Sequence, residues 1–173
     1  MSRVVIADAG PLIALAKIDQ LGLLQALFGG VTITSVVANE VFTDGLYPET
    51  PALKDAVKQD WMSVLSVTDD WQVECRDWMN LYQIDMGEAT SLTYASRCKA
   101  AGDHALVVLD DARGRAAAEH ADIAMIGTVG LLLLAKNQGL VPAVKPLLLD
   151  LRSHGYFLSE RLIRAAIQQA AEV

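Results

Sequence analysis

Two stretches of the sequence end an apolar run with an acid, and both acids could do chemistry. The run at 3–7, RVVIA, leads into Asp8, and the run at 105–109, ALVVL, leads into Asp110 and Asp111. Short runs rich in branched apolar residues are typical of strands buried on both faces of a parallel sheet. Because sites on such sheets form beyond the carboxyl ends of the strands, we expect Asp8 and Asp110 to meet in space.

Three further acids stand in helical segments and are candidates for the same site. Glu40 lies among valines and a phenylalanine in SVVANEVF, so we expect it near a buried face, where an unpaired carboxylate is costly. Glu88 falls in the first turn of a helix predicted for 86–102, and Asp85 precedes it by three residues, so the two can share one face. A structural alternative exists for five of these acids taken singly: Asp8, Asp110 and Asp111 could cap the helices that follow them, and Asp85 and Glu88 could simply favour a helix N-terminus.

Together, these carboxylates favour a site for a divalent cation. Carboxylates gathered in apolar surroundings repel one another, which raises their pKa values unless a cation neutralises them. Oxygen ligands without a cluster of His or Cys favour Mg²⁺ or Mn²⁺, and the chemistry that such ions support here is phosphoryl transfer. The sequence has no Ser-His-Asp signature, no Walker A lysine loop and no GxGxxG motif, which disfavours NTPase and dinucleotide-binding functions.

Composition and charge limit the class of protein. The chain has 173 residues, of which 53% are hydrophobic, which suffices for one full core and disfavours disorder. The longest apolar run, at 125–135, is shorter than the roughly 18–20 residues that span a bilayer, and Asp8 interrupts any signal-peptide core, so we expect a soluble cytoplasmic protein. A net charge of −7 disfavours a broad nucleic-acid-binding surface and suits a basic protein partner. Cys75 and Cys98 are expected to be reduced, partly buried thiols.

The strands and helices that must position these acids are predicted to alternate along the chain. Strands are predicted at 3–7, 31–34, 63–67, 105–109 and 123–126. Helices are predicted at 10–18, 21–28, 36–45, 52–59, 71–82, 86–102, 111–121, 128–139, 143–154 and 159–171. Ser35 would cap the helix that stops at Gly45. This alternation predicts an α/β domain with a parallel central sheet and right-handed crossovers, followed by two C-terminal helices.

Four motifs, in order along residues 3–142, make the sequence resemble the PIN-domain family of metal-dependent ribonucleases, which includes VapC-type toxins. The motifs are VVIADAGPLIALAKI, VVANEV, MGEATSLTYA and LVVLDDARGRAAAE. More closely, the sequence resembles a VapC-like PIN subgroup through its DAGPLIALAKI start, the GEA triplet, the double Asp and the later IGTVGLLLLAK. The resemblance implies a three-layer α/β/α fold with a mostly parallel sheet, in which residues 1–142 form the nuclease domain and residues 143–173 a helical extension packed on it.

The resemblance also implies roles for individual acids. The family's four metal-binding acids are matched, in order, by Asp8, Glu40, Glu88 and Asp110. Many members have Asp at the third of these positions. Asp111 would add a ligand or orient water, and Asp85 is a further candidate ligand. The implied cofactor is Mg²⁺ or Mn²⁺.

The sequence departs from the family pattern at two places. Gly10 stands where the family often has Ser, Thr or Asn, two residues after the first acid. Arg113 stands where many toxins have an aromatic residue. With Arg115 it could hold a substrate phosphate, and a solvated helix face is the alternative for both arginines.

Two functions of different classes follow. The first is a metal-dependent endoribonuclease, the toxin of a type II toxin–antitoxin pair, with an antitoxin partner and a homodimeric state implied by the resemblance. The second is a catalytically inactive PIN-fold binding module, which the low basic content and Gly10 favour. A phosphatase of the haloacid dehalogenase type needs DxD after the first strand, whereas this chain has Asp-Ala-Gly at 8–10. The two C-terminal helices could pack on the core, join a dimer or receive an antitoxin helix.

Overall fold

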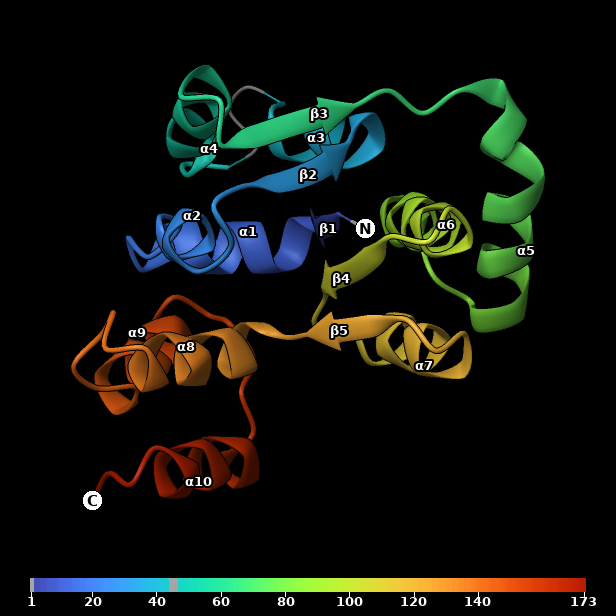
Figure 1. Ribbon diagram of the computed structural model, residues 1–173. Coiled ribbons are helices and arrows are strands. Elements are labelled where there is room, and N and C mark those ends of the chain that lie inside the picture. Colours follow the sequence, from blue (N-terminus) through green and yellow to red (C-terminus); the bar gives the residue numbers. More distant parts are fainter. Residues whose placement is uncertain (1, 44–46) are drawn as a thin grey trace.

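The computed structural model describes residues 2–43 and 47–173 and shows a three-layer α/β/α fold (Figure 1). Within these residues, five parallel strands form the central sheet in the order β3-β2-β1-β4-β5. The strands are β1 (Arg3–Ala7), β2 (Val31–Thr34), β3 (Met62–Leu65), β4 (His104–Val108) and β5 (Ala124–Ile126). Strand β1 is central and pairs with β4 along its whole length, so that Ala7 lies opposite Val108. The segments that follow these two strands therefore leave the sheet side by side.

Helices cover both faces of the sheet. They are α1 (Ala9–Lys17), α2 (Leu23–Phe28), α3 (Ser35–Val41), α4 (Thr50–Lys58), α5 (Gln72–Tyr82), α6 (Met86–Ala100), α7 (Ala112–His120), α8 (Thr128–Asn137), α9 (Lys145–Ser153) and α10 (Glu160–Gln169), with a 3₁₀ turn, η1 (Asp69–Trp71), before α5. Helices α5, α6 and α7 pack on one face, and the others contribute to the core on the opposite face. The predicted α/β class with a parallel sheet is confirmed.

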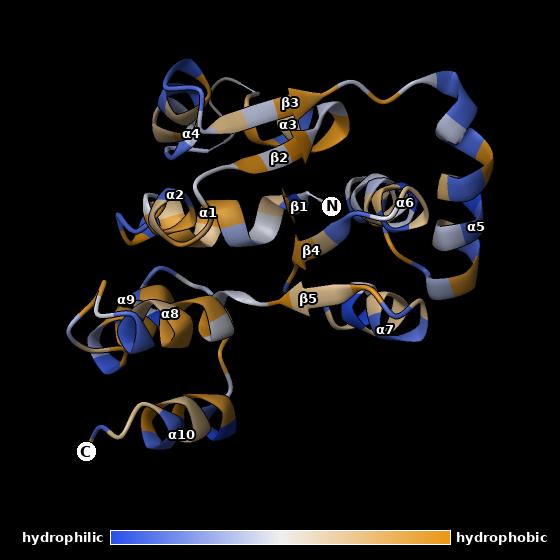
Figure 2. Ribbon diagram, in the orientation of Figure 1, coloured by the Kyte–Doolittle hydropathy of each residue, from blue (hydrophilic) through white to orange (hydrophobic). Residues whose placement is uncertain are grey.

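The alternation of side chains along the strands divides the core in two. In β1, Val5 and Ala7 belong to the cluster shared with α1 and α8, whereas Ile6 belongs to the cluster shared with α5, α6 and α7. Since both faces are covered, β1 and β4 are apolar on both sides over most of their length, as their continuous apolar runs predict. Among the helices, α1 and α8 are mostly hydrophobic, whereas α5 and α7 carry hydrophilic stretches (Figure 2).

The two C-terminal helices share the core of the sheet. Leu148 of α9 and Ile163 of α10 are buried in the same cluster as α1 and α8. Glu172, which follows α10, accepts hydrogen bonds from Lys136 Nζ at 2.7 Å and from the backbone N–H of Val144 at 2.6 Å. These donors, the lysine first, lower the pKa of Glu172 to about 2. Residues 143–173 are thus held by both apolar packing and a charge-assisted hydrogen-bond network.

Local boundaries differ from expectation at a few positions. Thr34, not Ser35, is the N-cap of α3, and its side chain accepts from the backbone N–H of Val37 at 3.3 Å. The prediction of Ser35 as the cap is therefore wrong by one residue, because Ser35 Oγ instead accepts from the N–H of Val67 at 3.0 Å. The predicted helix stop at Gly45 lies outside the described residues.

Two expectations from composition can be compared with the structure. Cys75 and Cys98 are both buried and free of any disulfide, as expected. No helix within residues 2–43 and 47–173 has the length and apolar character needed to cross a membrane.

Candidate functional site

The acids singled out from the sequence line one pocket at the carboxyl ends of the central strands. This pocket, called the acidic pocket below, has a volume of about 230 Å³. Besides Ala9, Gly10 and Pro11 at the start of α1, its lining consists of six acids, Asp8, Glu40, Asp85, Glu88, Asp110 and Asp111. Parallel pairing of β1 with β4 brings together residues that lie more than a hundred positions apart in the sequence.

Asp8 enters the pocket directly from the end of β1. Its backbone N–H donates to the carbonyl of Val108 at 3.1 Å, which continues the sheet pairing by one residue. Asp8 occupies the N-cap position of α1, yet its side chain makes no capping hydrogen bond. Helix capping therefore does not account for this half-buried carboxylate.

Asp85 and Glu88 form a reciprocal capping box at the start of α6. The Asp85 carboxylate accepts from the N–H of Glu88 at 2.8 Å, and Glu88 Oε2 accepts from the N–H of Asp85 at 3.1 Å. Glu88 is only 5% exposed, and its other oxygen, Oε1, is buried without a hydrogen-bond partner. Oε2 of Glu88 thus has a structural role in the capping box, whereas Oε1 lacks the partner that a buried charge requires.

A glycine in helix α7 makes room for that unpartnered oxygen. A Cβ at Gly114 would lie 2.8 Å from Glu88 Oε1 and 3.0 Å from Leu109 Cδ2. A glycine inside a helix costs about 1 kcal/mol relative to alanine, so a specific contact explains its presence. The Glu88 side chain therefore packs directly against the backbone of α7.

We predict that Gly114→Ala destabilises the protein by about 1–3 kcal/mol, even though alanine favours helices. The matched control is Gly10→Ala, because Gly10 is also helical and lines the acidic pocket, yet nothing lies within 4 Å of a Cβ there. The control should be neutral or up to about 1 kcal/mol more stable. Urea unfolding of the parent and both variants measures this, and equal midpoints for all three would refute the close packing of Glu88 on α7.

Asp110 is held by donors from the C-terminal third of the chain. Its Oδ1 accepts from the N–H of Thr128 at 2.7 Å, and its Oδ2 accepts from Thr128 Oγ1 at 2.5 Å and from the Tyr156 hydroxyl. Burial and then the charge of Asp110 raise the pKa of Tyr156. Sequence reasoning missed both donors. The GTVG stretch at 127–130 was a signal for Thr128, whereas nothing in the sequence marked Tyr156.

Asp111 and Glu40 lie at the exposed rim. Asp111 caps α7, accepting from the N–H of Arg113 at 2.8 Å and of Gly114 at 3.2 Å. Glu40 was expected near a buried face, and it lies beside the buried stripe that Val37 and Val41 form on α3, while Glu40 itself is exposed. Partial desolvation and the charge of Asp85 still raise its pKa.

The pocket concentrates negative charge. Burial, followed by the charges of Glu88, Asp85 and Glu40, raises the pKa of Asp8 to about 7. Burial, followed by the charges of Asp111 and Asp85, raises the pKa of Glu88 to about 7 as well. A metal-free pocket at neutral pH therefore retains protons that these carboxyls would otherwise release. In the described part of the chain, no three Asp, Glu, His or Cys side chains are already gathered into a coordination cluster.

The two candidate phosphate-binding arginines lie outside this pocket. Arg113 is exposed, and its Nη1 donates to the carbonyl of Gln83 at 3.3 Å. Arg115 is half-buried, and its Nη1 donates to the carbonyl of Leu109 at 3.1 Å. Among the described residues neither lines the acidic pocket, but Arg115 and Asp110 both line a neighbouring one.

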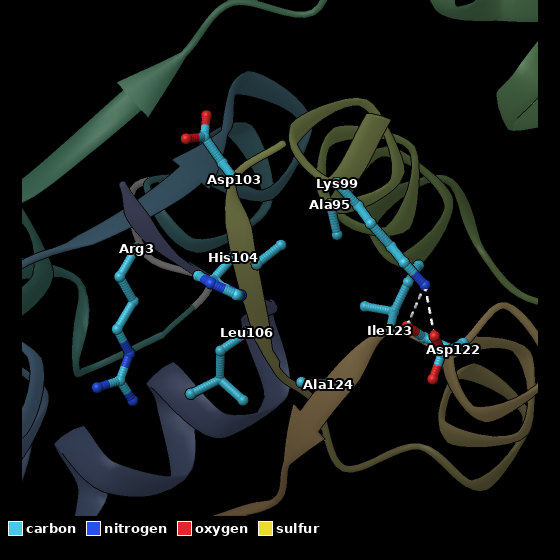
Figure 3. Close-up of a pocket in the computed structure, with 10 residues that line it drawn as sticks. Arg3, Ala95, Lys99, Asp103, His104, Leu106, Asp122, Ile123 and Ala124 are labelled. Atoms are coloured by element: carbon cyan, nitrogen blue, oxygen red, sulfur yellow. Dashed lines mark hydrogen bonds and ion pairs between the residues drawn. The ribbon is translucent and has the colours of Figure 1, made fainter. Parts of the chain in front are cut away.

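A hollow of about 370 Å³ lies at the opposite ends of β1, β4 and β5 (Figure 3). Its charged groups already serve the fold. Lys99 Nζ donates to the carbonyl of Asp122 at 2.6 Å and to its carboxylate at 2.8 Å, and Asp103 accepts from the N–H of Ser2 at 2.9 Å. Arg3 lies over the ring of Phe28. The carboxylates of this hollow are therefore engaged in contacts of the fold, whereas the buried, unpartnered oxygen Oε1 of Glu88 lies at the carboxyl edge of the sheet.

A family model described as a PIN domain matches residues 4–172, which includes β1 from its second residue, strands β2 to β5, every acid of the acidic pocket and both C-terminal helices. A comparison with curated proteins found no match.

Proposed function

Because the chain belongs to the PIN-domain family, whose members are generally nucleases, we propose that it is a Mg²⁺- or Mn²⁺-dependent endoribonuclease. One observation carries the proposal: carboxylates from β1, α3, α6 and the end of β4 line a single pocket. Within it, the buried Oε1 of Glu88 has no hydrogen-bond partner. A structural role leaves that oxygen unexplained, whereas a ligand would satisfy it.

The residues of the pocket fit a hard divalent cation. Carboxylate oxygens are the donors that Mg²⁺ and Mn²⁺ prefer, and the raised pKa values of Asp8 and Glu88 indicate charge that a cation would neutralise. We propose that the ion is held by Asp8, Glu40, Glu88 and Asp110, with Asp111 as an additional ligand or water-orienting group. Asp85 is a weaker candidate, because its carboxylate already caps α6. When bound, such an ion lowers the pKa of water and neutralises charge on a phosphodiester.

The chain's own residues prepare this site in three ways. Thr128 and Tyr156 fix the orientation of the Asp110 carboxylate. The capping box fixes Oε2 of Glu88 and leaves Oε1 available. Asp8 Oδ1 lies beside the backbone of α6, 3.6 Å from where a Cβ at Gly87 would be, which places the end of β1 against the start of α6.

We further propose that the protein is the toxin of a type II toxin–antitoxin pair and acts in the cytoplasm as a homodimer. The support is the motif order shared with VapC-type toxins, and a net charge of −7 suits a basic antitoxin. Residues 143–173 would act as an extension of the same nuclease domain, as their shared core supports.

Cleavage of single-stranded RNA by the purified protein tests the nuclease proposal. We expect products in Mn²⁺ or Mg²⁺ and a loss of at least about 100-fold in rate in EDTA. The matched measurement is titration of Mn²⁺ into metal-free protein by calorimetry. Absence of both cleavage and binding at millimolar Mn²⁺ would overturn the proposal in favour of the inactive binding module.

A further inference from the structure

A second cavity adjoins the acidic pocket and is unexplained by metal binding. This cavity, called the side pocket below, has a volume of about 510 Å³ and shares Asp110 with the acidic pocket. Its walls combine apolar side chains of β5 and α8, such as Ile126 and Leu133, with Phe157 from the segment between α9 and α10. Arg115 also lines it. A ligand in the side pocket would therefore lie beside Asp110, which lines both pockets.

Phe157 is the most unusual feature of this cavity. It is 89% exposed, although it is one of only three phenylalanines in the chain. Its neighbours in sequence are fixed, because Tyr156 donates to Asp110 and Leu158 is buried in the core. The ring is thus presented to solvent next to the acidic pocket by a backbone anchored on both sides.

Arg115 brings a cation to the boundary between the two pockets. A Cβ at Gly127 would lie 3.0 Å from Arg115 Nη1 and 2.9 Å from Asp110 Oδ1, so the guanidinium and the carboxylate flank the same backbone position. The bond from Nη1 to the carbonyl of Leu109 holds the guanidinium there. A guanidinium fixed in this way can donate to a phosphate oxygen or a base edge.

We propose that the side pocket binds the base of a nucleotide next to the scissile phosphate of single-stranded RNA. Phe157 stacks on the base, and Arg115 contacts the adjoining phosphate or base edge. The inference rests on the proposed nuclease function. Apolar walls, an exposed ring and a fixed arginine are the elements with which proteins hold unpaired bases.

The net charge strengthens this assignment. With a net charge of −7, the protein cannot rely on a broad basic surface to hold RNA. Base stacking supplies affinity that does not depend on counterion release, and only an unpaired base offers its face. A partner protein would also use an apolar groove, but the continuity with the acids and the fixed cation favour a nucleotide.

The test compares Phe157→Ala with Phe157→Tyr, which retains the ring. Since Phe157 is 89% exposed, both variants should melt as the parent does. In Mn²⁺ we expect Phe157→Ala to lower kcat/KM on single-stranded RNA by about 5- to 150-fold, mainly through KM, and Phe157→Tyr to retain most of it. An RNA with an abasic site beside the cleaved bond should weaken the parent similarly and weaken Phe157→Ala little further.

A binding measurement separates this proposal from the nuclease proposal. The probe is a short single-stranded oligonucleotide containing 2-aminopurine, titrated by fluorescence in Ca²⁺ against the parent and Phe157→Ala. Binding that weakens on loss of the ring supports the side pocket even if the parent cleaves no RNA, which would overturn only the nuclease function. Equal or absent binding by both proteins, or equal cleavage by both, overturns the side pocket and leaves its face to a protein partner.

Discussion

Asp8→Asn is expected to abolish metal-dependent RNA cleavage, lowering kcat/KM by about 10²- to 10⁴-fold, while making the metal-free protein more stable. The loss follows because asparagine has the same shape but lacks the charge that a cation requires from its ligand. The gain in stability follows because burial and the charges of Glu88, Asp85 and Glu40 disfavour the ionised form of Asp8 and raise its pKa to about 7. A neutral isostere removes that repulsion.

Cleavage kinetics in Mn²⁺ and thermal melting in EDTA check the two parts of this prediction separately. The control is Asp122→Asn, whose carboxylate is 97% exposed and pairs with Lys99 at the opposite edge of the sheet. It should cleave RNA as the parent does. Undiminished cleavage by Asp8→Asn would show that Asp8 is not a ligand. A lower melting temperature for this variant would mean that the Asp8 charge stabilises the fold.

The second large effect is a pH-dependent stabilisation by divalent cations. The carboxyl pKa of Asp8 is about 7 in the folded, metal-free protein, whereas an unperturbed aspartate, as in the unfolded chain, has a pKa of 3.8. Between these values Asp8 holds more protons in the folded protein than in the unfolded chain, so the contribution of Asp8 to metal-free stability is greatest below pH 4 and is lost as the pH rises through about 7. Glu88 changes stability in the same direction. A cation that replaces those protons should therefore stabilise most at alkaline pH.

Melting scans with Mn²⁺ at about 100 times its dissociation constant should show a stabilisation of about 2.7 kcal/mol at pH 8. For a domain of this size that corresponds to roughly 5–10 °C, with a clearly smaller shift at pH 5, where protons compete for the carboxylates. The double variant Asp8→Asn, Glu88→Gln is the control and should show little shift at either pH. An equal shift for the parent at pH 5 and pH 8 would contradict the linkage of metal to these two carboxyls.

The parallel sheet and the position of Asp8 and Asp110 at its edge could be predicted from the sequence. Strands β1 and β4 are covered on both faces, so their residues are almost continuously apolar and the first acid marks the end of each strand. Parallel pairing then places Asp8 and Asp110 at one edge without any knowledge of the loops. The sequence could therefore predict that the acids share one pocket, because this prediction needs only the apolar pattern of the strands and the parallel topology of the sheet.

The hydrogen-bond partners and the exposure of each acid were harder to predict from the sequence. Tyr156 reaches Asp110 from 46 residues later, and no local pattern reports a contact between a loop and a strand end. Glu40 was expected near a buried face because valines flank it, but flanking residues do not determine how exposed the acid itself is, and Glu40 lies at the exposed rim of the pocket. Thr34 and Ser35 are both good caps, and only the pairing of β2 decides where the helix begins.

Two glycines in the sequence also mark the crowded site around the acids. Gly114 and Gly127 each stand where a Cβ would collide with a carboxylate oxygen of the pocket, of Glu88 at 2.8 Å and of Asp110 at 2.9 Å. A glycine within a helix or directly after a strand marks close approach of the backbone to another group. From sequence alone, however, the group that approaches is unknown, so these positions identify a crowded site only once the acids are placed.

The pairing of β1 with β4 also has a consequence for synthesis on the ribosome. Asp8 is among the first residues made, but residue 104 must exist before β1 gains its central partner, and Tyr156 must exist before Asp110 is fixed. A nascent chain lacking these later residues carries the acids without the pocket. If the protein cleaves RNA as proposed, it cannot cleave the mRNA or damage the ribosome that are producing it until translation has passed Tyr156.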